Sequence, residues 1–189
     1  MPGALIAWAA LVGIVVLLVL AVIGIYNSLI RLRNQVDNAW SQIDVQLKRR
    51  HDLIPNLVET ARGYMKHERE TFEAITKARS AAVEARTVPE AAQAEGKLAE
   101  ALSRFMLVVE NYPELKANQN FLALQEELAG TENKITYARQ FYNDSVMAYD
   151  IARQKFPANV IAGAFGFKEQ REYFEPETPE ARAVPKVEF

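Results

Sequence analysis

The chain contains no cysteine and only two histidines, His51 and His67. Without cysteine there can be no disulfides, thiolate chemistry, lipoprotein processing or palmitoylation. The histidines stand in neither an HExxH nor a His-x-x-His pattern, and no phosphate-binding loop, G-x-G-x-x-G or G-x-S-x-G motif occurs. The sequence therefore predicts no catalytic residue, no metal site and no cofactor, and we expect a protein that is not an enzyme.

Charge is also absent from the N-terminal part of the chain. No Asp, Glu, Lys, Arg or His occurs from Pro2 to Ile30, and Ala4–Ile25 is almost wholly Ala, Leu, Val, Ile and Gly. As a helix this apolar run would extend roughly 33 Å, which is enough to cross the hydrocarbon core of a bilayer. Trp8 and Tyr26 bracket the run where interfacial aromatic residues are expected. We expect residues 1–30 to form one integral, single-pass transmembrane anchor.

The flanks of this run bear on its processing and its orientation. A secretory signal needs a basic n-region, a shorter apolar core and a small-residue cleavage site, and these are missing here.

Arg31 and Arg33 follow the run, whereas only the amine of Met1 precedes it. The positive-inside rule then predicts that the N-terminus lies outside and the helical domain in the cytoplasm, at the cell (inner or plasma) membrane.

Neither sign of charge dominates the rest of the chain. Lys and Arg number 22 against 24 Asp and Glu. The basic field that binding to nucleic acid requires is therefore missing. No small-molecule substrate is evident either, which leaves the membrane and other proteins as the expected partners.

The spacing of apolar residues predicts helix over most of the chain beyond the anchor. One stripe runs from Val36 to Ala61, and a stricter 3-4 repeat covers Phe121 to Phe156. Two shorter helices are expected between them, at about 66–86 and from Pro89 onward. Short turns between four helices favour antiparallel packing. The sequence predicts an all-α fold, an elongated antiparallel four-helix bundle with long first and fourth helices, and a kink in the first helix near His51, caused by Pro55.

The two middle helices are shorter than the outer two, so four helices can pack side by side over only part of the length. The remaining two-helix stalk would carry more large apolar side chains than two helices can bury. We expect some of that surface to contact another copy of the chain, a protein partner or the membrane. The candidate residues for this oligomer or stalk surface are Trp40, Phe141, Tyr142 and Tyr149.

An apolar stretch rich in Gly and Ala, Phe156–Lys168, follows the expected bundle at residues 31–156. It is too short to span a bilayer, and two interpretations stay open: shallow insertion at the membrane surface, or a tail folded back over the bundle. We assign residues 157–174 to this segment and expect the Pro- and Glu-rich residues 175–189 to be disordered. The candidate membrane-interfacial residues are Phe156, Val160, Ile161, Phe165 and Phe167.

Four consecutive basic residues cover one full turn of the first helix, and two interpretations of them stay open. They pair with Asp44 and Asp52 along the helix, or they form a docking face for an acidic partner. Arg50 falls on the apolar stripe, so we expect it to snorkel or to pair with Glu132 or Glu127 across the bundle. The candidate partner-docking residues are Lys48, Arg49, Arg50 and His51.

Four strings between Tyr26 and Phe174 are distinctive. They are AWSQIDVQLKRRHDLIPNLVE at 39–59, RFMLVVENYPELKAN at 104–118, ENKITYARQFYND at 132–144 and FPANVIAGAFGFK at 156–168. In order and spacing they closely resemble the LemA family of bacterial membrane proteins. The resemblance implies a single N-terminal membrane helix followed by an elongated antiparallel helical domain, and it implies no established enzymatic activity.

Three functional hypotheses follow. The first is a non-catalytic, membrane-anchored helical scaffold or interaction protein of the LemA type, which forms a homo-oligomer or recruits a protein partner. The second is a membrane-organising or membrane-remodelling module that acts through Phe156–Lys168 and oligomerisation. The third is an enzyme or enzyme subunit, for which the sequence supplies no candidate chemistry.

Overall fold

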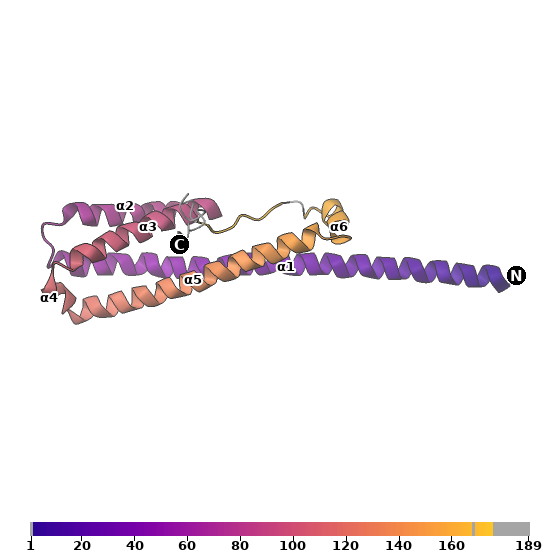
Figure 1. The fold of residues 1–189 in the computed structure, drawn as a ribbon, viewed down its shortest axis with the longest axis horizontal. Helices are drawn as coiled ribbons and strands as arrows, with labels where there is room; N and C mark the ends of the chain where they lie inside the picture. Colours follow the sequence, from indigo (N-terminus) through magenta and orange to yellow (C-terminus); the bar gives the residue numbers. More distant parts are fainter. Residues whose placement is uncertain (1, 168, 176–189) are drawn as a thin grey trace, which may run out of the picture. The chain divides into compact units, whose positions relative to one another are not determined.

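The computed structural model describes residues 2–167 and 169–175, so the tail expected to be disordered lies, from residue 176 on, outside the described residues. Every regular element among the described residues is a helix (Figure 1). The fold is therefore all-α, as the sequence predicts, with a long and largely apolar first helix. The helices are α1 Pro2–Arg62, α2 Arg69–Glu84, α3 Val88–Val109, α4 Pro113–Lys116, α5 Gln119–Gln154 and α6 Ala158–Ala164.

The start of α3 shows how the local sequence sets a helix boundary. The hydroxyl of Thr87 accepts a hydrogen bond from the backbone N–H of Glu90 at 3.3 Å, and the carboxylate of Glu90 accepts one from the N–H of Thr87 at 3.2 Å. This capping box satisfies two donors that no helical carbonyl can reach. Pro89 stands in the first turn, where an N–H would have no helical partner.

Helix α1 continues through Pro55, for which the sequence predicts a kink near His51. Because proline has no N–H, the carbonyl of His51, four residues earlier, loses its helical partner. In the structure, Nε of Arg79 on α2 donates a hydrogen bond to that carbonyl at 2.7 Å. A tertiary hydrogen bond thus satisfies the group that the proline leaves unpaired.

The chain divides into two compact units, residues 1–39 with 144–171 and residues 40–143 with 172–189. In the first unit, α1 is exposed at every described side chain from Leu5 to Ile23, and its first buried residue is Leu29. The end of α5, α6 and the residues after it contact α1 there. Nε2 of Gln35 donates to Oγ of Ser145 at 3.4 Å, and Arg171 pairs with Asp37 at 3.0 Å.

The second unit has an apolar core to which α1, α2, α3 and α5 contribute. Leu57 of α1, Ile75 of α2, Phe105 of α3 and Phe121 of α5 are almost completely buried in it. The ring centroid of Phe105 lies 6.2 Å from that of Phe72 and 6.3 Å from that of Phe121. These distances fit aromatic packing, and removal of this apolar area from water is the main stabilising term.

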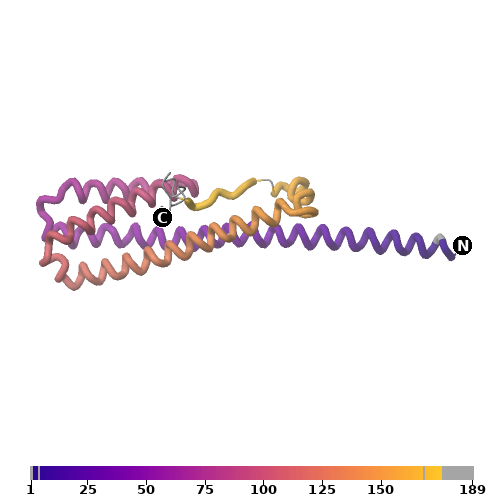
Figure 2. Tube along the Cα trace, in the orientation of Figure 1, coloured from indigo at the N-terminus to yellow at the C-terminus, as the bar shows by residue number. Residues whose placement is uncertain are grey.

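The segment after α6 has no regular secondary structure over its described residues 169–175, and its path can be followed in Figure 2. Its last residues belong to the second unit. There Asn143 holds Phe174 by two hydrogen bonds: Oδ1 of Asn143 accepts from the backbone N–H at 2.9 Å, and Nδ2 donates to the carbonyl at 3.4 Å. Phe174 is buried as a result.

Candidate functional site

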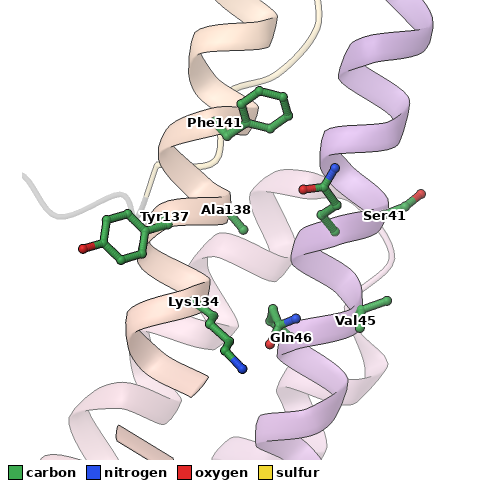
Figure 3. A pocket seen from close by; sticks show the side chains of 8 residues that line it. Ser41, Val45, Gln46, Lys134, Tyr137, Ala138 and Phe141 are labelled. Carbon is green, nitrogen blue, oxygen red and sulfur yellow. The ribbon is translucent and has the colours of Figure 1, made fainter. Parts of the chain in front are cut away.

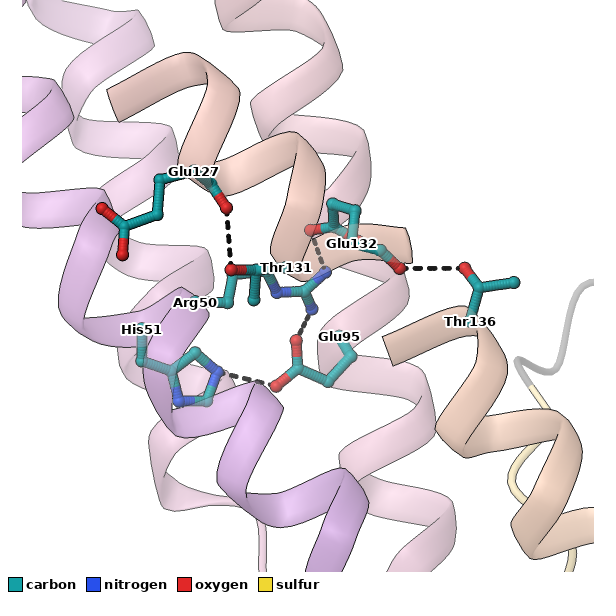
Figure 4. A network of polar contacts seen from close by, with 7 residues as sticks. All are labelled: Arg50, His51, Glu95, Glu127, Thr131, Glu132 and Thr136. Atoms are coloured by element: carbon teal, nitrogen blue, oxygen red, sulfur yellow. Dashed lines mark hydrogen bonds and ion pairs between the residues drawn. The ribbon is translucent and has the colours of Figure 1, made fainter. Parts of the chain in front are cut away.

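A cluster of ionisable side chains lies inside the second unit, between α1, α3 and α5 (Figure 4). Arg50, whose residue is only 2% exposed, forms ion pairs with Glu95 and Glu132. Its Nη1 lies 2.7 Å from Oε1 of Glu132. Nε2 of His51 lies 2.7 Å from Oε1 of Glu95. The predicted pairing of Arg50 with Glu132 is confirmed.

Glu95 joins this cluster, and sequence reasoning missed it. It is buried on α3 between Ala91 and Leu98, at the spacing that places all three on one helix face. The sequence signal that could have identified Glu95 is an acidic residue on an otherwise apolar face of the helix. A buried carboxylate needs compensating partners, and Arg50 and His51 supply them from the neighbouring helix.

The surroundings of His51 favour a neutral imidazole. Burial, followed by the positive charges of Arg50 and Arg79, lowers the pKa of His51 from 6.5 to about 4. A carboxylate can only accept, so Nε2 of the neutral ring carries the proton and donates to Glu95. The cluster thus joins α1 to α3 and α5 by charge-assisted contacts, an arrangement that holds the three helices in one register.

The structure separates the four predicted docking residues into two pairs. Arg50 and His51 are buried in the cluster, so they offer no surface to a partner, and the docking prediction is corrected for them. Lys48 and Arg49 are exposed, and for them it stays a prediction. Arg49 pairs with Glu127 of α5 at 2.6 Å. Among the described residues, no ion pair joins the four to Asp44 or Asp52.

An open groove of about 580 Å³ lies between α1 and α5 in the second unit (Figure 3). Val45 on α1 is 62% exposed and Tyr137 on α5 is 73% exposed. The buried Oε1 of Gln46 makes no hydrogen bond with any residue that the structure describes. The groove is lined by Ser41, Gln42, Val45, Gln46, Lys134, Tyr137, Ala138 and Phe141.

Two of the four residues predicted for an oligomer or stalk surface are not surface residues. Tyr142 and Tyr149 are buried, which corrects the prediction for both. The chain itself covers Tyr142: its hydroxyl donates to the carbonyl of Glu172 at 2.7 Å. Trp40 is half-buried, with its ring 5.9 Å from that of Phe174. Only Phe141, in the groove, is exposed.

Tyr149 belongs to the first unit. Its burial raises the pKa of the phenol, an effect that the nearby cations Arg153, Arg171 and Arg33 oppose. The phenol therefore stays neutral at physiological pH. Sequence periodicity placed this ring on the helix stripe but did not show that the same chain would cover it.

The five predicted membrane-interfacial residues also divide. Ile161 and Phe167 are buried in the first unit. The exposed fractions are 84% for Phe156, 62% for Val160 and 56% for Phe165. Lipid contact stays a prediction for these three residues, and the buried pair instead fixes the position of α6.

The N-terminal part of α1 is a candidate membrane span by length and composition. Its most apolar window of 18 residues has a mean hydropathy of 3.1, and none of that window is buried in the protein. Among the described residues, no group of three His, Cys, Asp or Glu side chains is placed to hold a metal ion.

These features define a class: over its described residues, the chain is an all-α protein with one candidate membrane-spanning helix at the N-terminal end. The LemA family model matches residues 39–189, which is most of the chain, and the chain belongs to the LemA family. The family resemblance stated from the sequence is thereby confirmed.

Three relatives show similarity over most of the chain. Magnetosome protein MamQ 2 of Paramagnetospirillum magneticum is 28% identical over 176 residues, covering 79% of this chain. Magnetosome protein MamQ of Magnetospirillum gryphiswaldense is 25% identical over 175 residues, again covering 79%. Protein LemA of Metamycoplasma hominis is 27% identical over 143 residues, covering 74%. The chain spans 64% of the length of each of these relatives.

Proposed function

We propose that this chain is a non-catalytic, membrane-anchored scaffold whose helical domain associates with a second copy through the groove between α1 and α5. Membership in the LemA family and the candidate membrane span support the anchored architecture. The observation that carries the interaction role is the groove, where Val45 and Tyr137 expose apolar and aromatic surface side by side with the exposed ring of Phe141.

The proposed scaffold is an antiparallel four-helix bundle made by α1, α2, α3 and α5. All four contribute to the apolar core of the second unit, and the turns between consecutive helices are short. Both features favour antiparallel packing of neighbouring helices. The buried cluster of Arg50, Glu95 and Glu132 supports the same arrangement, because it joins three of the four helices.

We further propose that the anchor crosses the cell (inner or plasma) membrane with the helical domain in the cytoplasm. Arg31 and Arg33 flank the apolar run on that side. A single cysteine at the exposed Ser103 tests this, because the chain has no other. Labelling by an impermeant maleimide only after cell lysis is the expected result. Labelling in intact cells would place the domain outside.

Self-association suits the groove because of the anchor. Anchored copies share one orientation, so the same groove lies at the same distance from the bilayer in each. A two-fold symmetric interface uses the same patch on both copies, so it requires a patch that is complementary to itself. Confinement to the membrane also raises the effective concentration of the second copy. Tyr and Phe are enriched at such interfaces, as Tyr137 and Phe141 would be here.

A photo-cross-linking amino acid placed at Tyr137 tests the association in native membranes. Two differently tagged copies are co-expressed, and the cross-linked product is expected to carry both tags. The matched control places the same amino acid at Leu107 of α3, an exposed apolar position outside the groove, where no such product is expected. If the chain with the cross-linker at Tyr137 is recovered with only one tag, either as a monomer or as an adduct with another protein, self-association is contradicted.

A membrane-organising role is the second candidate, acting through Phe156–Lys168 and oligomerisation. Two relatives are named as magnetosome proteins, and Phe156, Val160 and Phe165 expose apolar surface next to the membrane-exit end of α1. Deformation of liposomes by the purified full chain would favour this role. Liposomes that keep their shape at saturating protein density would count against it.

A further inference from the structure

The exposure of α1 marks where a bilayer would end. Side chains from Leu5 to Gly24 are all exposed, and burial against the protein begins only at Ile25 and Tyr26. At 1.5 Å per residue, those exposed residues extend about 30 Å, the thickness of the hydrocarbon core. Tyr26 therefore stands at the boundary between hydrocarbon and headgroups, a position that tyrosine favours.

Helix α6 is held at this boundary by direct contacts within the first unit. The ring centroid of Tyr26 lies 5.4 Å from that of Phe165 and 5.5 Å from that of Phe167, both in edge-to-face geometry. The guanidinium of Arg33 stacks over Phe167 at 5.5 Å. With Ile161 also buried, α6 has a fixed inner side that faces α1.

The outer side of α6 is apolar and exposed. Phe156 and Val160 are 84% and 62% exposed, and Phe165, which packs edge-to-face on Tyr26, is still 56% exposed. The apolar run on α1 is also exposed, from Leu5 to Gly24. Two cations near this surface in the sequence are also exposed, Lys155 directly before Phe156 and Arg31 on α1, five residues after Tyr26. Exposed apolar side chains together with cations fit a layer of lipid headgroups, which offers phosphates above and acyl chains below.

We propose that the apolar surface at α6 inserts into the lipid headgroup layer beside the point where α1 leaves the bilayer. This surface is made by Val160 of α6, by Phe156 just before the helix and by the exposed part of Phe165 just after it. The lipid surface is the occupant because the α6 face continues the lipid-facing surface of the anchor at Tyr26. α6 would then form, with the anchor, a second membrane contact that fixes how the chain stands on the bilayer. The inference rests on the proposed membrane anchoring.

The test is spin-label accessibility in the full chain, reconstituted at one copy per lipid nanodisc of zwitterionic and anionic phospholipid. Single cysteines are introduced as V160C and F156C, and collision rates with oxygen and with a water-soluble nickel complex are compared. Oxygen concentrates in lipid, so a raised ratio of oxygen to nickel collisions reports insertion. L18C in the anchor serves as the lipid control. V83C on α2, another exposed valine, serves as the water control.

We expect the ratio at both α6 sites to lie above that of V83C and below that of L18C. A ratio at Val160 and Phe156 equal to that of V83C overturns the inference, and so does low collision with both reagents, which means cover by protein. Anchoring itself is read at L18C, so a lipid-exposed L18C with water-exposed α6 sites refutes only the α6 contact. A water-exposed L18C would refute the anchor. Melting curves that match the unlabelled chain confirm the fold of each variant.

Discussion

The apolar side chains of helix α1 are exposed near its N-terminal end and buried near its C-terminal end. Leu17, near the N-terminal end, is 68% exposed, whereas Leu57, near the other end, is 1% exposed. The N-terminal part is apolar on all sides and carries no charge, while the C-terminal part has one apolar stripe and buries a charged cluster. Hydropathy alone does not predict burial in protein: a helix that is apolar all round matches an apolar solvent, and a striped helix needs partner helices.

Removal of the buried charge is expected to have the largest effect at the striped end. Glu95→Ala leaves His51 without its acceptor and Arg50 with Glu132 alone, inside the core. Removal of one partner from a buried ion pair costs about 3–5 kcal/mol of unfolding free energy, and the partner that Arg50 keeps, Glu132, is itself partly exposed. Urea unfolding of the full chain in detergent micelles, followed by circular dichroism, measures the change.

The matched control is Glu127→Ala. Glu127 also pairs with an arginine of α1, Arg49, but both partners are well exposed. Exposed ion pairs contribute at most about 1 kcal/mol. Equal losses for the Glu95 and Glu127 variants would show that burial of the cluster has no energetic consequence.

One substitution made at both ends of α1 tests the comparison directly. Leu57→Ala opens a cavity in the core of the second unit, and we expect a loss of about 2–5 kcal/mol. Leu17→Ala removes the same atoms from an exposed position and should leave the urea midpoint unchanged. Both variants are measured in the same micelles. A destabilising Leu17→Ala would mean that the N-terminal part of α1 also packs against protein.

Apolar periodicity was sufficient to predict the long helices and the all-α class, and the uncharged apolar run predicted the candidate anchor, because each of these depends on local sequence. The short helices α4 and α6 were not predicted. Because Arg50 falls on an apolar stripe, the sequence also predicted that it would snorkel or pair with Glu132 or Glu127, and it pairs with Glu132. The other partners could not be predicted. Glu95 and Arg79 reach the first helix only once α2 and α3 are packed, and spacing within one helix carries no information on that register.

The burial of Tyr142 by the chain itself shows the same limit of prediction from periodicity. Tyr142 was predicted to be surplus surface because the two expected stalk helices could not bury it. A segment without regular secondary structure buries it instead: the carbonyl of Glu172 accepts from its hydroxyl, and Phe174 packs on Trp40 beside it. Such a segment has no periodicity, so its path could not be read from the sequence.

The hydrogen bond from Arg79 to the carbonyl of His51 allows a test of packing at the C-terminal end of α1, with a smaller expected effect. Arg79→Ala removes the donor that satisfies the carbonyl of His51, and an unpaired buried carbonyl costs about 1–3 kcal/mol. Pro55→Ala restores an N–H that can bond this carbonyl along the helix. In the Pro55→Ala background, Arg79→Ala should therefore cost less. The double-mutant cycle is measured by urea unfolding. Equal costs in both backgrounds would contradict the proposed compensation.

The smallest expected effect is a dependence of stability on pH. The pKa of His51 is about 4 in the folded chain and has the ordinary value of 6.5 when unfolded. Between these values the unfolded chain binds the proton and the folded chain does not, so stability falls as the pH drops from 6.5 to 4. Because solvent screens part of the effect, we expect a loss of about 1–2 kcal/mol over that range.

His51→Gln isolates this contribution, because the amide can still donate to Glu95 but does not titrate. The difference in unfolding free energy between the parent chain and this variant cancels the carboxylates that titrate in both. That difference should decrease as the pH is lowered from 6.5 to 4, and it should stay constant above pH 7. The N-terminal end of α1 cannot be its source, since no Asp, Glu, Lys, Arg or His occurs from Pro2 to Ile30. If Glu95 instead kept the proton on His51, the same difference would rise as the pH falls, and the neutral imidazole would be refuted.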